Sequence, residues 1–84
     1  MDPRRLKAFL VLAEEKSFHK AAERLYLSQP ALTQRIQALE RELGVRLLER
    51  RPFRLTPAGD LLRREGARLL KELEALKEAV RRAG

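Results

Sequence analysis

One segment of the sequence, from Ser28 to Leu43, places side chains that can form specific hydrogen bonds on a single helical face. At about 100° per residue, this face holds small or polar residues, namely Pro30, Gln34, Gln37 and Arg41, with Ala31 and Thr33 beside them. A glutamine amide can form two hydrogen bonds with adenine, an arginine guanidinium can do the same with guanine, and a threonine or alanine methyl can pack on the thymine methyl. Because no bulky apolar side chain blocks this face, it is suited to contacts with base edges.

The opposite face of the same segment is apolar, as in a helix packed on a core. Its large residues follow one another at helical spacing and are Leu32, Ile36, Leu39 and Leu43. We expect all four to face the core. Ser28 is a favourable N-cap, Pro30 fits the first turn because its missing N–H costs little there, and Gly44 is a favourable stop. Taken alone, the pattern is also compatible with an ordinary surface helix whose polar face meets water.

Two shorter helical patterns precede this segment. A first helix is predicted from Asp2 and Pro3, an N-cap followed by proline, to about Glu15. A second begins after the capping residue Ser17 and ends near Leu25, and its small apolar face consists of Phe18, Ala21, Ala22 and Leu25. Two short helices joined by a tight turn form a helix-turn-helix, whose second helix can enter the DNA major groove.

A small hairpin is predicted after Gly44. Its two β-prone stretches are about Arg46–Leu48 and Phe53–Thr56, and the turn between them is Glu49–Pro52. Arg50, Arg51 and Arg54 lie on this hairpin, which we interpret as a wing, residues 46–56, that contacts a minor groove or phosphates. The alternative is a basic turn that meets only solvent.

The remaining chain predicts one long helix of about 26 residues, beginning after Thr56 and Pro57. Its heptad positions are Leu62, Gly66, Leu69, Leu73, Leu76, Val80 and Ala83. We expect the first part, widened by Leu61 and Leu70, to pack on the domain's own core. The rest should project with Leu73, Leu76 and Val80 exposed.

An exposed apolar row favours self-association through an antiparallel pair of these helices. The candidate dimerisation residues are Leu62, Leu69, Leu73, Leu76 and Val80, and Gly66 would allow the backbones to approach closely. The alternative is a helix that folds back and completes a monomeric four-helix bundle. We therefore divide the chain into a core, residues 1–56, and a long linker or dimerisation helix of the same domain, residues 57–84.

Composition agrees with a small basic binding domain. The 84 residues carry 19 Lys and Arg against 12 Asp and Glu, a net charge of +7, which suits a polyanionic partner but also an acidic protein or an anionic membrane surface. Residues 1–56 hold net +5 of this charge. No apolar run could span a bilayer and no signal-peptide pattern is present, so we expect a cytoplasmic protein without a membrane partner.

The chain offers little to an enzyme. It has one histidine, His19, no cysteine and no glycine-rich phosphate loop, while Ser17 and Ser28 are better explained as helix caps. We expect no catalytic, metal or cofactor site. A helical protein-interaction module is the stronger alternative, because the heptad helix predicts association with or without DNA. Such a module has no need for an arginine-bearing hairpin beside Thr33, Gln34 and Gln37.

The order of these motifs resembles the N-terminal DNA-binding domain of LysR-type bacterial transcriptional regulators. The resemblance covers nearly the whole chain and rests on the run SFHKAAERLYLSQPALTQRIQALERELGVRLLER followed by RLTPAG. One departure lies between Arg50 and Leu55, where the chain is about two residues shorter than is typical of the family and lacks the usual glycine.

The resemblance implies a mainly α, winged helix-turn-helix fold with a long C-terminal dimerisation helix. It also implies a homodimer on an inverted-repeat site in double-stranded promoter DNA, followed by an effector-sensing domain that could add higher oligomers. By that pattern, the residues that meet the bases would be Gln29, Pro30, Ala31, Thr33 and Gln34. We add Arg35 and Gln37 from the same helix, residues 28–43, and Arg50, Arg51 and Arg54 from the wing as candidate DNA-binding residues.

Overall fold

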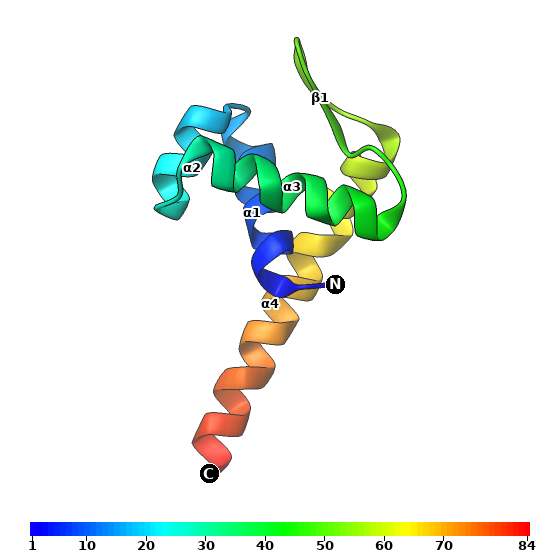
Figure 1. The fold of residues 1–84 in the computed structure, drawn as a ribbon. Helices are drawn as coiled ribbons and strands as arrows, with labels where there is room; N and C mark the ends of the chain where they lie inside the picture. The colour runs from blue at the N-terminus through cyan, green and yellow to red at the C-terminus, as the bar shows by residue number, and fades with distance from the viewer.

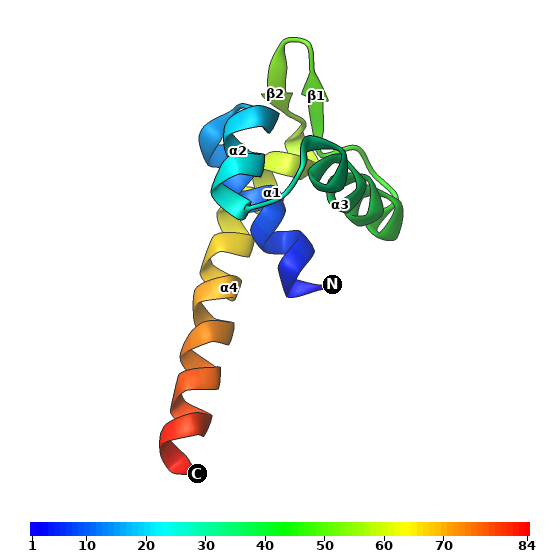
Figure 2. The same ribbon diagram turned by 60° about the vertical axis from the view of Figure 1, so that its left-hand side comes forward.

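The computed structural model describes all residues from 1 to 84, and Figures 1 and 2 show it from two sides. In chain order the elements are α1 (Pro3–Glu15), α2 (Phe18–Leu25), α3 (Gln29–Leu43), β1 (Leu48–Arg50), β2 (Phe53–Leu55) and α4 (Pro57–Ala83). The hairpin and the C-terminal end of α4 lie at opposite ends of the molecule in both views. The predicted mainly α architecture with one antiparallel hairpin is confirmed.

Local capping signals determine where each helix begins. The caps are Asp2, Ser17, Ser28 and Thr56, whose side-chain oxygens accept hydrogen bonds from the backbone N–H groups of Arg4, Lys20, Ala31 and Gly59. These bonds satisfy donors that have no partner inside the helix. Gly44 ends α3 with a φ of 73°, in the left-handed region that glycine adopts without a steric penalty.

The core is built around α1, which packs against the other three helices. The largest fully buried side chains of the core are Phe9 and Leu12 of α1, Leu32 and Leu39 of α3, and Leu47 before β1. No buried side chain is polar or charged. Because α3 packs only its apolar stripe on this cluster, its opposite face stays open to solvent.

Two details of α3 and the hairpin differ from the prediction. Leu43 does not face the core but is 37% exposed, because the last turn of α3 extends past the buried cluster. The first strand is also displaced by two residues, to Leu48–Arg50, whereas the second begins at Phe53 as predicted; β1 pairs with β2 in the register Leu48↔Leu55 and Arg50↔Phe53. The turn is therefore only Arg51-Pro52, joined by a cis peptide bond.

The long helix α4 packs on the core only through its first half. Gly66 is buried, and a Cβ built there would lie 2.8 Å from Cδ1 of Leu6, so this glycine lets α4 approach α1 of the same chain. Leu70 packs on the core as predicted, whereas Leu61 is 53% exposed, contrary to the prediction, because it lies on the outer face of α4.

The second half of α4 projects away from the other helices, as both ribbon views show. The molecule consequently measures 47 Å in its longest dimension against 26 and 20 Å in the others. The alternative of a helix that folds back into a four-helix bundle is therefore wrong. None of the helices, α4 included, has the length and hydropathy needed to cross a membrane.

Candidate nucleic-acid interface

The exposed face of α3 carries the predicted recognition residues. Gln29, Pro30, Gln34 and Gln37 are exposed, while Ala31, Thr33 and Arg35 are half-buried at its margins. Ser28 Oγ, which accepts the backbone N–H of Ala31 at 3.1 Å, fixes the first turn. The N-terminal end of α3 is thus an open, polar and rigid surface.

His19 connects the first turn of α2 to the first turn of α3. Its Nδ1 lies 3.4 Å from the Gln29 side-chain nitrogen, and its Nε2 lies 3.5 Å from a carboxylate oxygen of Glu23. The structure keeps His19 exposed but places it directly beside a candidate base-contacting side chain.

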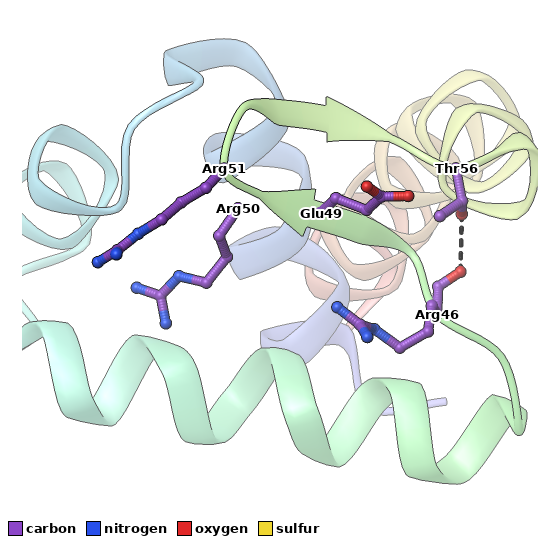
Figure 3. A pocket seen from close by; sticks show the side chains of 5 residues that line it. All are labelled: Arg46, Glu49, Arg50, Arg51 and Thr56. Carbon is purple, nitrogen blue, oxygen red and sulfur yellow. Dashed lines mark hydrogen bonds between the residues drawn. The ribbon is translucent and has the colours of Figure 1, made fainter.

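The arginines of the hairpin have different surroundings. Arg54 Nη2 lies 3.1 Å from Glu49 on the paired strand, so part of its charge is compensated. The guanidinium carbon of Arg50 lies 3.8 Å from the centre of the Phe18 ring. Arg51, at the tip, has no ion-pair partner. Figure 3 shows Arg50 and Arg51 extending from the end of β1 toward the side on which α3 lies.

A set of hydrogen bonds fixes the base of the hairpin to α3 and α4. A carboxylate oxygen of Glu40 accepts the backbone N–H of Leu47 at 2.8 Å. Thr56 Oγ1 donates to the carbonyl of Arg46 at 2.7 Å, the bond drawn in Figure 3. The same Thr56 hydroxyl accepts from Gly59 as the cap of α4. These bonds hold the hairpin in one orientation relative to α3.

A groove of about 340 Å³ separates α3 from β1. Its walls include Thr33 and Gln37 of α3 on one side and Arg50 of β1 on the other, with Phe18 between them. Helix and wing therefore present polar side chains to a single surface channel. Sequence reasoning identified three of these residues and missed Phe18, for which the only signal was an aromatic residue directly after a capping serine.

Arg35 belongs to a different part of the surface. It lies beside Arg4 and Arg5 near the start of α1, and together with Asp2 these residues line a small hollow. Arg4 is bonded to Asp2 and Arg5 is paired with Glu42, which leaves Arg35 as the basic side chain of this hollow without an ion-pair partner. The structure therefore separates Arg35 from the wing arginines and joins it to the N-terminal end of the chain.

The side chains whose pKa values are clearly shifted lie on or beside α1, α2 and α4. Hydrogen bonds from Arg63, and then from Arg64, lower the pKa of Asp60 in the first turn of α4. A hydrogen bond to Glu14 is the main cause of the raised pKa of Arg24. All these groups are exposed, so the pairs are surface contacts of small energetic weight. No group of side chains is arranged to hold a metal ion.

The predicted dimerisation residues form a partly exposed row on α4. Leu69, Leu76 and Val80 are 50%, 60% and 62% exposed. Leu62 instead packs on the chain's own core, and Leu73 is half-buried rather than exposed. The open part of the row thus lies on the projecting half of α4.

Known proteins show the same arrangement. Residues 3–60 match the family model of bacterial regulatory helix-turn-helix proteins of the lysR family. The chain is 40% identical over 84 residues to the HTH-type transcriptional regulator BenM of Acinetobacter baylyi, with 98% of this chain and 28% of BenM covered. It is 48% identical over 82 residues to an uncharacterized HTH-type transcriptional regulator of Azotobacter vinelandii, with 95% and 57% covered.

The fold agrees equally well with a solved structure. The crystal structure of the BenM DNA-binding domain in complex with catB site 1 DNA matches with a TM-score of 0.92 at 40% identity, covering 99% of this chain and 96% of that one. The chain spans little more than a quarter of BenM and little more than half of the second relative. By sequence and by fold, the chain belongs to the lysR family of bacterial regulatory helix-turn-helix proteins.

Proposed function

We propose that this chain is the DNA-binding part of a transcriptional regulator and that it binds double-stranded DNA with α3 in the major groove. One observation carries the proposal: Thr33 and Gln37 of α3 border the same groove as Arg50 of the wing. The BenM domain of the same fold was solved with DNA, which supports it. We further propose that this role is binding without a catalytic step and that it is carried out in the cytoplasm, with chromosomal DNA as the partner.

The candidate residues divide by chemistry. We assign base contacts to the exposed N-terminal face of α3, namely Gln29, Pro30, Ala31, Thr33, Gln34 and Gln37, because their amides and methyl groups can distinguish base edges. We assign phosphate or minor-groove contacts to Arg50, Arg51 and Arg54 of the wing and phosphate contact to Arg35, because guanidinium groups bind phosphate irrespective of sequence.

We also propose a homodimer that forms through α4. The exposed row at Leu69, Leu76 and Val80 supports it, because such a row on a projecting helix is normally covered. A two-fold axis between antiparallel copies of α4 would present two α3 helices to an inverted repeat with half-sites about one helical turn apart. In this proposal residues 1–56 are the DNA-contacting core and residues 57–84 the linker helix.

Binding to generic duplex DNA across a salt series tests the DNA proposal. Affinity should fall steeply as salt rises, because each neutralised phosphate releases condensed counterions. The 84-residue chain and a duplex of about 30 base pairs, three helical turns, suffice for fluorescence anisotropy. A chain that fails to bind this duplex even at low salt would favour a helical protein-interaction module, the function that the row on α4 alone would support.

A further inference from the structure

Phe18 occupies a junction between three elements. It is the first residue of α2, its half-buried ring packs against the core, and it meets the ring of Phe53 in β2 edge-on, with centroids 6.4 Å apart and planes at 69°. Its ring therefore faces the wing from the helix-turn-helix. A leucine would fill much the same apolar volume but would lack the aromatic face.

That aromatic face carries Arg50. The guanidinium carbon lies 3.8 Å from the ring centre, within the range of a cation–π contact. Arg50 has no carboxylate partner, unlike Arg54, which is bonded to Glu49. Its charge is thus held in place by the ring while it remains available to an anion.

The Phe18 ring lies where it directs the guanidinium of Arg50 toward α3. Phe18 and Arg50 line the groove together with Thr33 and Gln37 of α3, and Figure 3 shows the Arg50 side chain directed from β1 toward α3. Although Arg50 belongs to the wing in sequence, its guanidinium lies over the channel that borders the recognition helix. The wing and α3 therefore share one charged group.

We infer that Phe18 is a positioning residue, whose ring holds Arg50 over the groove between α3 and β1 so that the guanidinium meets a DNA phosphate bordering the recognition helix. This inference rests on the proposed DNA-binding function. A side chain that is already ordered loses less conformational entropy on binding, and the guanidinium fork matches the geometry of a phosphate. Phe18 contributes to affinity only through Arg50 and does not touch the DNA.

A double-mutant cycle isolates this role. Affinity for a random-sequence duplex of about 30 base pairs, three helical turns, is measured for the wild-type chain, Phe18→Leu, Arg50→Ala and the double variant. We expect Phe18→Leu to weaken binding about two- to five-fold, the size of an exposed cation–π contact. Arg50→Ala should lower the slope of log affinity against log salt by about 1. In the Arg50→Ala background, Phe18→Leu should cost nothing further.

Two further variants separate positioning from packing. Phe18→Tyr keeps the ring and should retain wild-type affinity even if Phe18→Leu lowers the melting temperature. Phe53→Leu removes the edge-on neighbour but leaves the ring beneath Arg50, so any loss it causes should be the same with and without Arg50. Equal losses for Phe18→Leu in both backgrounds would overturn the inference. If the wild-type chain does not bind the duplex at low salt, the proposed DNA-binding function itself is contradicted.

Discussion

The carboxylate of Glu40, near the C-terminal end of α3, accepts the backbone N–H of Leu47 at 2.8 Å. Leu47 is buried, and the Glu40 side chain is only 16% exposed. This bond joins α3 to the segment that enters the wing, across seven residues of chain. The orientation of the wing relative to α3 therefore depends on a polar contact that neither element forms within itself.

Removing this acceptor should destabilise the fold. Glu40→Ala leaves the N–H of Leu47 buried without a partner, and we expect a loss of about 1–3 kcal/mol in the free energy of unfolding. Glu40→Gln keeps an acceptor oxygen and should lose less. Urea denaturation followed by circular dichroism measures both. Glu42, a more exposed carboxylate paired with the N-terminus and Arg5, provides the control, since Glu42→Ala should cost well under 1 kcal/mol.

Two glycines of α4 should respond differently to alanine. A Cβ at Gly59 would overlap the backbone carbonyl of Leu47, which cannot move without displacing the wing. A Cβ at Gly66 would come too close only to the flexible end of Leu6, while Leu62 and Leu10 would lie at ordinary contact distance. We expect Gly59→Ala to lower the free energy of unfolding by about 3 kcal/mol, at the upper end of the penalties for overpacking. Gly66→Ala should cost much less, because alanine regains about 1 kcal/mol of helix propensity. A smaller loss for Gly59→Ala in thermal unfolding would contradict this packing.

Substitutions in α3 should lower DNA affinity in a way that depends on the DNA sequence, whereas substitutions in the wing should lower it for every sequence. Gln34→Ala should lose about 1–3 kcal/mol of binding free energy on a duplex selected from a random pool, and little on a duplex of scrambled sequence. Arg51→Ala should weaken both and lower the salt slope by about 1. Binding titrations on the two duplexes measure the difference. Equal losses of affinity for Gln34→Ala on the two duplexes would contradict a base contact by Gln34.

Arg68→Ala is the matched charge control for Arg51→Ala. It removes one positive charge from α4, where Arg68 is bonded to Glu65 and Glu72. Because this site is remote from α3 and the wing, the salt slope should stay at its wild-type value. A slope lowered as much as in Arg51→Ala would mean that net charge, rather than a local contact, governs binding.

The row on α4 should control the oligomeric state. Leu76→Glu combined with Val80→Glu places charges on the exposed apolar positions, and we expect a monomer at concentrations where the wild-type chain dimerises. Size-exclusion chromatography with light scattering measures the mass. Ala75→Glu adds charge on the same helix away from the row and should leave the dimer intact. A wild-type chain that stays monomeric at every concentration would contradict the proposed interface.

The helices could be predicted from the sequence because their signals are local. Ser17, Ser28 and Thr56 each precede a helix that they cap through bonds spanning three residues. The open polar face of α3 could be predicted from the spacing of its apolar residues, because that spacing indicates which side of the helix packs on the core. Only at Leu43 did this spacing mislead, because periodicity does not show where the core ends.

The arrangement of the wing could not be predicted, because its contacts join distant residues. Arg50 meets Phe18 across 32 positions of the sequence, and neither residue type by itself indicates the other. The bonds of Glu40 and Thr56 likewise depend on the path of the chain between α3 and α4. Arg46 and Leu47, predicted to start the first strand, are engaged by these bonds, and β1 begins only at Leu48.

The continuity of α4 has a geometric consequence. No proline or glycine interrupts it between Gly66 and Ala83, so the projecting half is a stiff rod attached to the core. Each residue added to this rod would turn its far end by about 100° and advance it by about 1.5 Å. In a paired assembly, a single inserted residue would rotate the two recognition helices out of phase, whereas seven, about two full turns, would nearly restore the phase and lengthen the span. In the proposed homodimer, the length of α4 would therefore set both the spacing and the angular phase of the two DNA contacts.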